Sequence, residues 1–172
     1  MYRHIFVVAL VLCQGCNDVG ELLSFQLSDT ASFRIESSSA INLPFEVPTP
    51  EVTTNSTQRF QNHHTKAELV RDVKLKELSI TVTEPATKSF SFLKSIHLYI
   101  STDELEEVEL AFLEDINTTS NHLVLAPVEH KLDEYVKSPS YRVRTEIVTR
   151  ETITEDVEVR ADITFNVMAD PL

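Results

Sequence analysis

The strongest pattern in the sequence is an alternation of apolar and polar residues toward its C-terminal side. Between residues 157 and 169 every second residue is apolar: Val157, Val159, Ala161, Ile163, Phe165, Val167 and Ala169. A period of two predicts a β-strand with one buried face and one solvent-facing side. Residues 141–149 alternate in the same way, and the short polar link Arg150-Glu151-Thr152 follows them. We therefore expect the two segments to pair as an antiparallel hairpin.

Shorter alternations upstream predict further strands. They cover residues 73–82, 96–100, 108–112 and 123–125, with candidate strands at 25–27, 33–35 and 41–45. In the longest of these the alternation slips between Leu75 and Leu78, where two residues separate the apolar positions. An extra residue in one strand produces a β-bulge, which would restore the phase of the alternation. We expect a bulge at this point.

Two short segments have a helical pattern. Leu132, Tyr135 and Val136 are spaced i, i+3 and i+4, and a Ser-Pro pair follows them. This spacing predicts a short helix that ends before the proline. Thr65 and Glu68 form a capping-box pattern, so residues 65–70 could form a second short helix.

Short strands without the repeated long helices of a parallel sheet predict an all-β protein. We expect an antiparallel β-sandwich, immunoglobulin-like or related, of roughly seven to nine strands. One short helix precedes the C-terminal hairpin, and residues 21–172 form a single domain. Residues 44–65 contain three prolines. We interpret them as an irregular excursion that could hold one edge strand at residues 58–61.

The composition narrows the function classes. Of 172 residues only two are glycine, Gly15 and Gly20. Rossmann and Walker-type phosphate loops need several glycines close together, so nucleotide-binding folds built on them are excluded. Downstream turns have to be made by Asn, Asp, Ser and Pro, in connections longer than a two-residue Asn-Gly hairpin. Any binding function would sit most naturally in those loops.

The charge balance bears on the partners. The formal net charge is −12, from 27 acidic and 15 basic residues. Binding to nucleic acid needs a clustered Lys/Arg face, and electrostatic docking on anionic lipid needs the same sign of charge. We therefore expect no nucleic acid partner, and an acidic surface that favours solubility.

Residues 1–15 have the layout of a signal peptide. Arg3 gives a basic start, residues 5–12 are an unbroken apolar run, and Cys13-Gln14-Gly15-Cys16 closes it with small and polar residues. The run is too short to span a bilayer, which takes about 20 residues. The two cysteines also match the redox motif C-x-x-C. That motif belongs at the start of a helix after a strand, whereas these cysteines follow an apolar run at the N-terminus, so we do not expect a redox site. A secretory signal cut nearby and a retained N-terminal strand are the alternatives.

Gly15-Cys16, directly after a short apolar run, resembles the cleavage site of bacterial lipoproteins. The resemblance implies that residues 1–15 are removed, that Cys16 carries the lipid, and that residues 16–20 are anchor and tether. It also implies the outer membrane, since Asn17 rather than Asp follows Cys16; the leaflet, periplasmic or surface, stays open. With its β-rich layout, the chain resembles the uncharacterised outer-membrane lipoproteins of Bacteroidetes-type bacteria. Without lipid on Cys16 the protein would be secreted.

Candidate metal ligands are few. His63 and His64 are adjacent, and His97, His122 or His130 could complete a site. Adjacent side chains on a strand point to opposite faces, so such a pair rarely binds one ion. We expect no metal site and interpret the pair as part of a polar loop.

Two other segments have both a functional and a structural interpretation. The acidic run at residues 103–107 could attract Ca²⁺, but it lacks the alternation and the turn glycine of an EF-hand loop. We expect a charged loop. Phe90, Phe92, Leu93 and Tyr99 form an aromatic-rich patch. We expect it in the core, with an apolar pocket or partner surface as the alternative.

These observations favour a non-catalytic module of the cell envelope that binds or scaffolds a protein or glycan and uses no cofactor. The membrane would be reached through the lipid on Cys16. One alternative is a carrier that holds an apolar ligand between the sheets near residues 90–99, in an enclosed cavity. The other is a hydrolase on a sandwich scaffold, which needs a cleft where titratable side chains converge. No G-x-S-x-G elbow supports a hydrolase.

Overall fold

The computed structural model describes residues 22–37 and 41–172 of the chain. The signal peptide, the lipid attachment at Cys16 and the tether were predicted for residues 1–20, which lie outside the described residues. In the described part, no helix is both long and apolar enough to cross a membrane.

Antiparallel strands dominate the described chain. The strands are β1 (Leu23–Ile35), β2 (Phe45–Val47), β3 (Val52–Thr53), β4 (Val70–Glu84), β5 (Leu93–Ser101), β6 (Val108–Leu113), β7 (His122–Pro127), β8 (Ser140–Thr149) and β9 (Val157–Ala169). The helices are α1 (Ser56–Asn62) and α2 (Asp133–Lys137), with 3-10 turns η1 (Ala67–Leu69) and η2 (Phe90–Phe92). All pairings between these strands are antiparallel, so the all-β prediction is confirmed.

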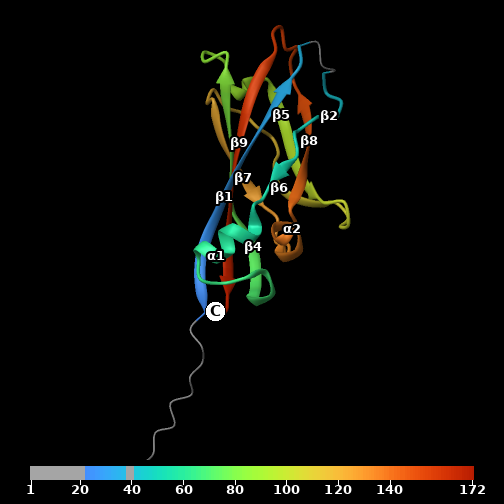
Figure 1. Ribbon diagram of the computed structural model, residues 1–172. Helices are drawn as coiled ribbons and strands as arrows, with labels where there is room; N and C mark the ends of the chain where they lie inside the picture. The colour runs from blue at the N-terminus through green and yellow to red at the C-terminus, as the bar shows by residue number, and fades with distance from the viewer. Residues whose placement is uncertain (1–21, 38–40) are drawn as a thin grey trace, which may run out of the picture.

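The strands follow one hydrogen-bonded path, β1-β9-β4-β7-β6-β5-β8-β2, and β3 pairs with β8 beside it. The path curls, so that β1, β9 and β4 lie across the core from β5, β8 and β2 (Figure 1). β7 links the two halves, because it pairs with β4 at residues 78–81 and with β6 at two positions. The structure is thus one curled nine-stranded sheet, and a closer likeness to an immunoglobulin-type sandwich stays a prediction.

The predicted alternation of the C-terminal strand is confirmed in β9. All seven of its apolar positions, from Val157 to Ala169, are at most 1% exposed. They pack against inward-facing residues from the other half of the sheet, such as Ile96, Leu98 and Ile147, which are fully buried. Burial of apolar side chains on this scale is the main favourable contribution to folding.

The predicted C-terminal hairpin is wrong. β8 pairs with β5, β2 and β3, whereas β9 pairs with β1 and β4. The link at residues 150–156 passes from one half of the sheet to the other, and Ile153 in it is 1% exposed. Because this apolar side chain enters the core, the chain crosses over the core instead of turning back on β8.

The predicted edge strand at residues 58–61 is also wrong, because this segment forms α1. The helix buries Ser56 and Phe60 and leaves its other side chains at least partly exposed. With so few buried positions its apolar periodicity is too weak to be seen in the sequence.

The predicted helix at residues 65–70 is reduced to the 3-10 turn η1, and β4 begins at Val70. The capping box does not form, because the side chain of Thr65 donates to the carbonyl of Asp170 instead, at 2.7 Å. This bond joins the segment before β4 to the end of β9.

α2 confirms the short helix predicted before β8, and it covers part of the edge of β4. The main-chain N–H of Leu132 donates to the carbonyl of Val73 at 2.9 Å, and the carboxylate of Asp133 accepts from the N–H of Val73 at 2.8 Å. β7 pairs with β4 only at residues 78–81, and α2 therefore supplies the partners of the N–H and the carbonyl of Val73 on the same edge.

Two further predictions about the backbone are confirmed. The register of β4 against β9 shifts between Leu75 and Glu77, where the bulge was expected. Among the described residues, positive φ angles occur at Asn42, Asn55, His64 and Asp115. Three of these four are Asn or Asp, the residue types expected to replace glycine at turns.

Candidate binding face

The outer face of the β2, β8, β5 and β6 strands carries a dense group of charged and aromatic side chains. We call this group the Arg144 face. It consists of Glu46, His97, Tyr99, Glu107, Glu109, Phe112, Arg144 and Glu146. The strands place these residues side by side through their register: His97 lies opposite Glu146 and Phe112, and Tyr99 lies opposite Arg144 and Glu109.

Arg144 is the centre of this face. Its guanidinium lies 4.0 Å from the centre of the Tyr99 ring. It donates to both carboxylate oxygens of Glu107, at 2.8 and 2.9 Å, and to Glu146 and Glu46, at 3.1 and 3.2 Å. The hydrogen bonds that Arg144 donates to Glu107 raise its pKa and, together with the hydrogen bond to Glu146 and the charges of Glu107 and Glu46, outweigh the opposite effect of burial. The guanidinium is therefore held in one orientation by a ring and three carboxylates.

His97 lies beside this centre, between two carboxylates. Its Nδ1 lies 2.6 Å from Glu109 and its Nε2 lies 3.0 Å from Glu114. The ring stacks on Phe112, with 5.8 Å between the centroids. Partial burial lowers the pKa of His97, but the hydrogen bonds and charges of Glu109 and Glu114 outweigh burial, so the pKa is raised. His97 can thus carry a proton near neutral pH and bind both carboxylates.

An open hollow of about 530 Å³ adjoins Arg144. Its lining combines two guanidinium groups, two carboxylates, a serine and a threonine hydroxyl, and apolar residues of β2, of β8 and of the loop after β2. The lining residues are Glu46, Val47, Pro48, Thr49, Ser101, Glu107, Arg142, Val143 and Arg144. A surface of this kind presents both donors and acceptors to a polar partner.

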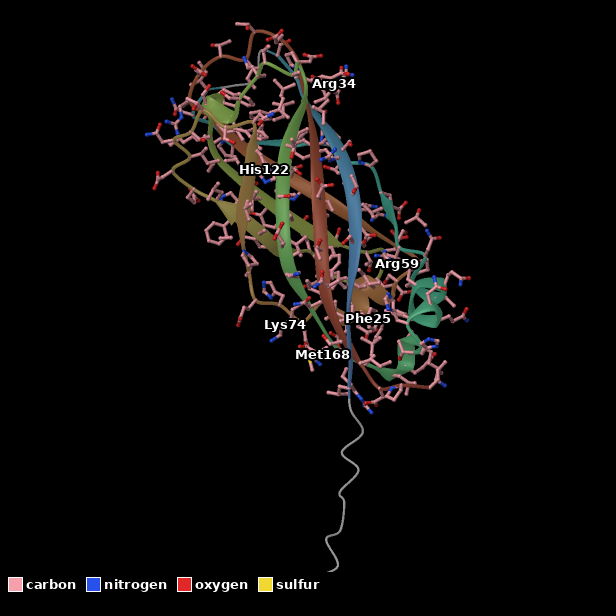
Figure 2. All side chains as sticks on the ribbon, turned by 90° about the vertical axis from the view of Figure 1, so that its left-hand side faces the viewer. Phe25, Arg34, Arg59, Lys74, His122 and Met168 are labelled. Carbon is pink, nitrogen blue, oxygen red and sulfur yellow. The ribbon has the colours of Figure 1, made fainter. Side chains whose placement is uncertain are left out.

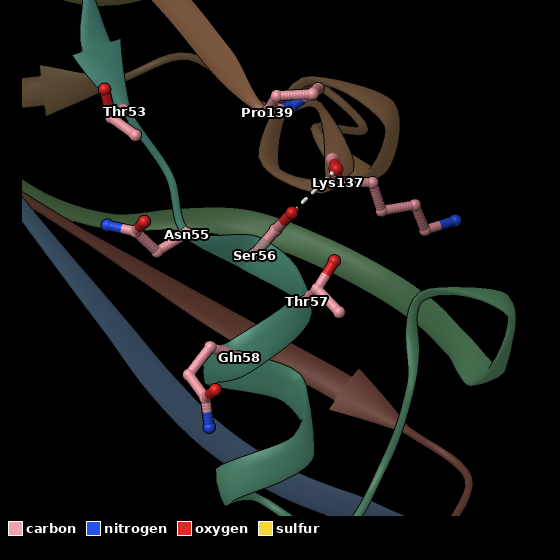
Figure 3. A pocket seen from close by; sticks show the side chains of 7 residues that line it. All are labelled: Thr53, Asn55, Ser56, Thr57, Gln58, Lys137 and Pro139. Atoms are coloured by element: carbon pink, nitrogen blue, oxygen red, sulfur yellow. Dashed lines mark hydrogen bonds between the residues drawn. The ribbon is translucent and has the colours of Figure 1, made fainter.

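A second hollow, of about 360 Å³, lies where α1 meets the end of α2 (Figure 3). The hydroxyl of Ser56 points across it and donates to the carbonyl of Lys137 at 2.9 Å. The buried Thr54 donates to the carbonyl of Ser138 at 2.5 Å and accepts from the N–H of Ser56. These hydroxyls hold the two helices together, and no histidine or carboxylate lines the hollow to activate them.

A buried polar cluster joins β1, α1 and β8. The guanidinium of Arg59 donates to one carboxylate oxygen of Asp29 at 2.6 Å, and the hydroxyl of Tyr141 donates to the other at 2.9 Å. Arg59 also donates to the carbonyl of Ser28 at 3.1 Å. Burial, followed by the negative charge of Asp29 and the hydrogen bond to it, raises the pKa of Tyr141, so the hydroxyl stays protonated. The three side chains satisfy one another, which is typical of a structural cluster.

The histidines considered as metal ligands are dispersed. His63 stacks on Phe25, with 4.1 Å between the ring centroids, and His64 ends α1 in the left-handed conformation. His97 belongs to the Arg144 face, His122 accepts from or donates to Thr81 at 3.0 Å, and His130 lies in the loop before α2. The part of the chain that the structure describes contains no group of three or more His, Cys, Asp or Glu side chains that could hold a metal ion.

The aromatic-rich patch divides between core and surface. Phe90, Phe92 and Leu93 are fully buried in the core. Tyr99 lies on the opposite face of β5, against Arg144. The core interpretation is therefore confirmed for Phe90, Phe92 and Leu93, and for Tyr99 the partner-surface alternative stays a prediction.

The acidic run at residues 103–107 lies in the loop between β5 and β6, where a charged loop was expected. Asp103 forms a close ion pair with Arg142, and Glu107 is bound to Arg144. Glu107 therefore contributes to the Arg144 face and its hollow, and Asp103 pairs with Arg142, which also lines the hollow. The sequence did not reveal this role, because the arginines lie some 40 positions along the chain, on a different strand.

Comparison with known proteins assigns the chain to no family. No family model matches the chain, and no curated protein matches it. A solved structure of Desmodium yellow mottle tymovirus aligns with 100% of this chain and 95% of its own, at 12% identity and a TM-score of 0.32. The empty head of turnip yellow mosaic virus aligns with 99% of this chain and 92% of its own, at 15% identity and a TM-score of 0.27. Similarity this low supports no conclusion on the fold or function of this chain.

Proposed function

We propose that the chain is a lipid-anchored, non-catalytic binding module of the bacterial cell envelope. The observation that carries the binding function is the Arg144 face, where Arg144 is fixed against Tyr99 and three carboxylates beside an open hollow. Apart from Glu107, which lies at the end of the loop before β6, these side chains stand on paired strands, which hold them more rigidly than loops would. A prearranged surface loses little conformational entropy when it binds.

The arrangement of the other polar groups supports a non-catalytic role. Asp29, Arg59 and Tyr141 converge, but they neutralise one another in a structural cluster. The hydroxyls of Thr54 and Ser56 donate to main-chain carbonyls at the α1–α2 contact. Phe90, Phe92 and Leu93, which were the basis for the apolar-carrier alternative, are packed in the core. We therefore favour binding over transport of an apolar ligand or hydrolysis.

The anchor is tested on Cys16, with Cys13 as the matched control. The full chain is expressed in a bacterium that processes lipoproteins, and membrane and supernatant fractions are compared after labelling with radioactive palmitate. We expect Cys13→Ser to remain labelled and membrane-bound, and Cys16→Ser to lose the label and leave the membrane. A Cys16→Ser protein that still takes up label or still sediments with membranes would overturn the anchor.

The binding face is tested by comparing variants in one capture experiment. Envelope extracts are passed over immobilised wild-type protein, Arg144→Gln, and Arg160→Gln. Arg160 is the control, because it pairs with Asp162 on the outer face of the other half of the sheet. We expect Arg144→Gln to lose partners that wild type and Arg160→Gln retain, with all three showing the same unfolding midpoint. Equal capture by the three proteins would exclude the Arg144 face as the binding surface.

A further inference from the structure

The chain enters the fold at one end, which we call the tether-side end. β1 begins there at Leu23, and β9 finishes beside it, because Leu23 is paired with Ala169 and Ser24 with Met168. Figure 1 shows the start of β1 beside the C-terminal end of the described chain. In Figure 2, Met168 and Phe25 lie near this end and Arg34 lies at the other.

The tether-side end exposes large apolar side chains. Leu22 is 41% exposed, Met168 39% and Leu172 76%. These are three of the six large hydrophobic residues classed as exposed in the described part of the chain. Main-chain bonds hold the segment of Met168 and Leu172: the N–H of Asp170 donates to Leu69, and the N–H of Leu172 donates to His64, at 2.9 and 3.0 Å. A fixed group of exposed apolar side chains at one end is typical of a contact surface.

The same end carries no net charge, although the chain as a whole carries −12. Within residues 22–26, 63–74 and 166–172, the basic side chains are Lys66, Arg71 and Lys74, and the acidic ones are Glu68, Asp72 and Asp170. Arg71 is paired with Asp170 and Lys74 with Asp72. The described residues of this end therefore add no net repulsion from an anionic membrane, and the acidic side chains next to them in the sequence are Asp18 and Glu21 of the tether.

The length of the tether limits how far the tether-side end can lie from the membrane that holds the proposed lipid. Residues 17–22 separate Cys16 from the first residue of β1. The seven steps from Cys16 to Leu23 span at most about 25 Å when fully extended, at up to 3.6 Å per residue. If Cys16 carries a lipid, as proposed above, this end of the domain cannot move far from the headgroups.

We infer that the tether-side end rests on the lipid surface, with Leu22, Met168 and Leu172 at the interface of headgroups and acyl chains. The contact is apolar and independent of lipid charge, and it fixes which way the domain faces. The loops at the opposite end then point away from the membrane (Figure 1). The exposed Leu43 lies in one of them, between Asn42, whose N–H donates to the carbonyl of Thr149 at the end of β8, and β2. This inference rests on the proposed lipid anchor and adds an orientation to it.

Hydroxyl-radical footprinting of the unaltered protein tests the contact. The lipidated protein is reconstituted into phosphatidylcholine vesicles, isolated by flotation and oxidised, and each residue is quantified by mass spectrometry against the released Cys16→Ser protein. Met1 and Met168 are the only methionines in the sequence, and Met1 lies in the predicted signal peptide. We expect a several-fold loss of oxidation at Met168 and Leu172 on vesicles, with Leu43 unchanged as the internal control.

The outcomes separate this inference from the anchor. A wild-type protein that does not float with the vesicles overturns the anchor itself. A protein that floats, but in which Met168 and Leu172 oxidise as fast as in Cys16→Ser, keeps the anchor and overturns the contact. Protection that appears in the Cys16→Ser protein and grows with its concentration identifies a second copy as the occupant, and overturns the lipid contact.

Discussion

The carboxylate of Asp133 takes the place of a neighbouring strand for Val73, whose main-chain N–H donates to it at 2.8 Å in a buried position. Asp133→Ala leaves this N–H without a partner, so we expect a loss of about 1–3 kcal/mol in the free energy of unfolding. Asp133→Asn keeps an acceptor oxygen and should lose much less. Chemical denaturation measures both. Equal losses in the two variants would show that the charge, rather than the acceptor, stabilises this edge.

His64 ends α1 in a conformation that favours glycine. Its φ is 57°, the N–H of Thr65 donates to Phe60, and the N–H of His64 donates to Gln61, which together form a Schellman motif. A side chain with a Cβ costs about 1–2 kcal/mol in this conformation. His64→Gly removes this cost and should raise the free energy of unfolding. The gain is limited to about 1 kcal/mol, because the greater entropy of glycine in the unfolded chain opposes it. Gln61→Gly, inside the helix, should lower the free energy of unfolding, and a loss in both variants would contradict the prediction.

The Asp29–Arg59–Tyr141 cluster should behave as a unit. Arg59→Met leaves the carboxylate of Asp29 buried without its cation, and we expect a loss of about 3 kcal/mol in stability. Adding Asp29→Asn removes the unpaired charge and keeps an acceptor for Tyr141, so the double variant should recover part of that loss. A double-mutant cycle by urea denaturation measures the coupling. Additive effects would mean that the two side chains do not interact energetically.

His97 should make the stability of the Arg144 face depend on pH. Its pKa is raised in the fold, so protonation favours the folded state. Its contribution, about 0.5–1 kcal/mol, is fully present below the unfolded pKa near 6.5 and is lost as the pH rises through the folded pKa. Comparison of wild type with His97→Gln between about pH 5.5 and 9 should show a stability difference that shrinks with rising pH. A difference that stays constant would contradict the role of Glu109 and Glu114.

The sequence predicts strands well because alternation is a local property. Each apolar position of β9 could be assigned from its neighbours alone, and so could the bulge after Leu75. Pairing partners are not local. The link between β8 and β9 has the composition of a turn, and only the burial of Ile153 distinguishes it from one.

The site was harder to predict than the strands. Arg144 meets Glu107 across 37 positions and Glu46 across 98, so their contact depends on the register of three strands. The sequence does contain a sign that Asp29 is unusual, because this acidic residue alternates with Leu27 and Ala31, which face the core. A polar residue in an apolar row predicts a buried partner, but it does not identify Arg59 or Tyr141.

β9 is the last strand of the described chain, yet it lies between β1, the first, and β4. Ser28 and Thr164, neighbours on these strands, are 136 positions apart. Contacts between such distant segments form late and slowly. While the chain is being made, β1 therefore has no strand to pair with until β9 has emerged, and we expect the sheet to be completed only then. If the chain is exported as proposed, this delay keeps it in a form that can be threaded through a translocation channel, and folding begins on the far side.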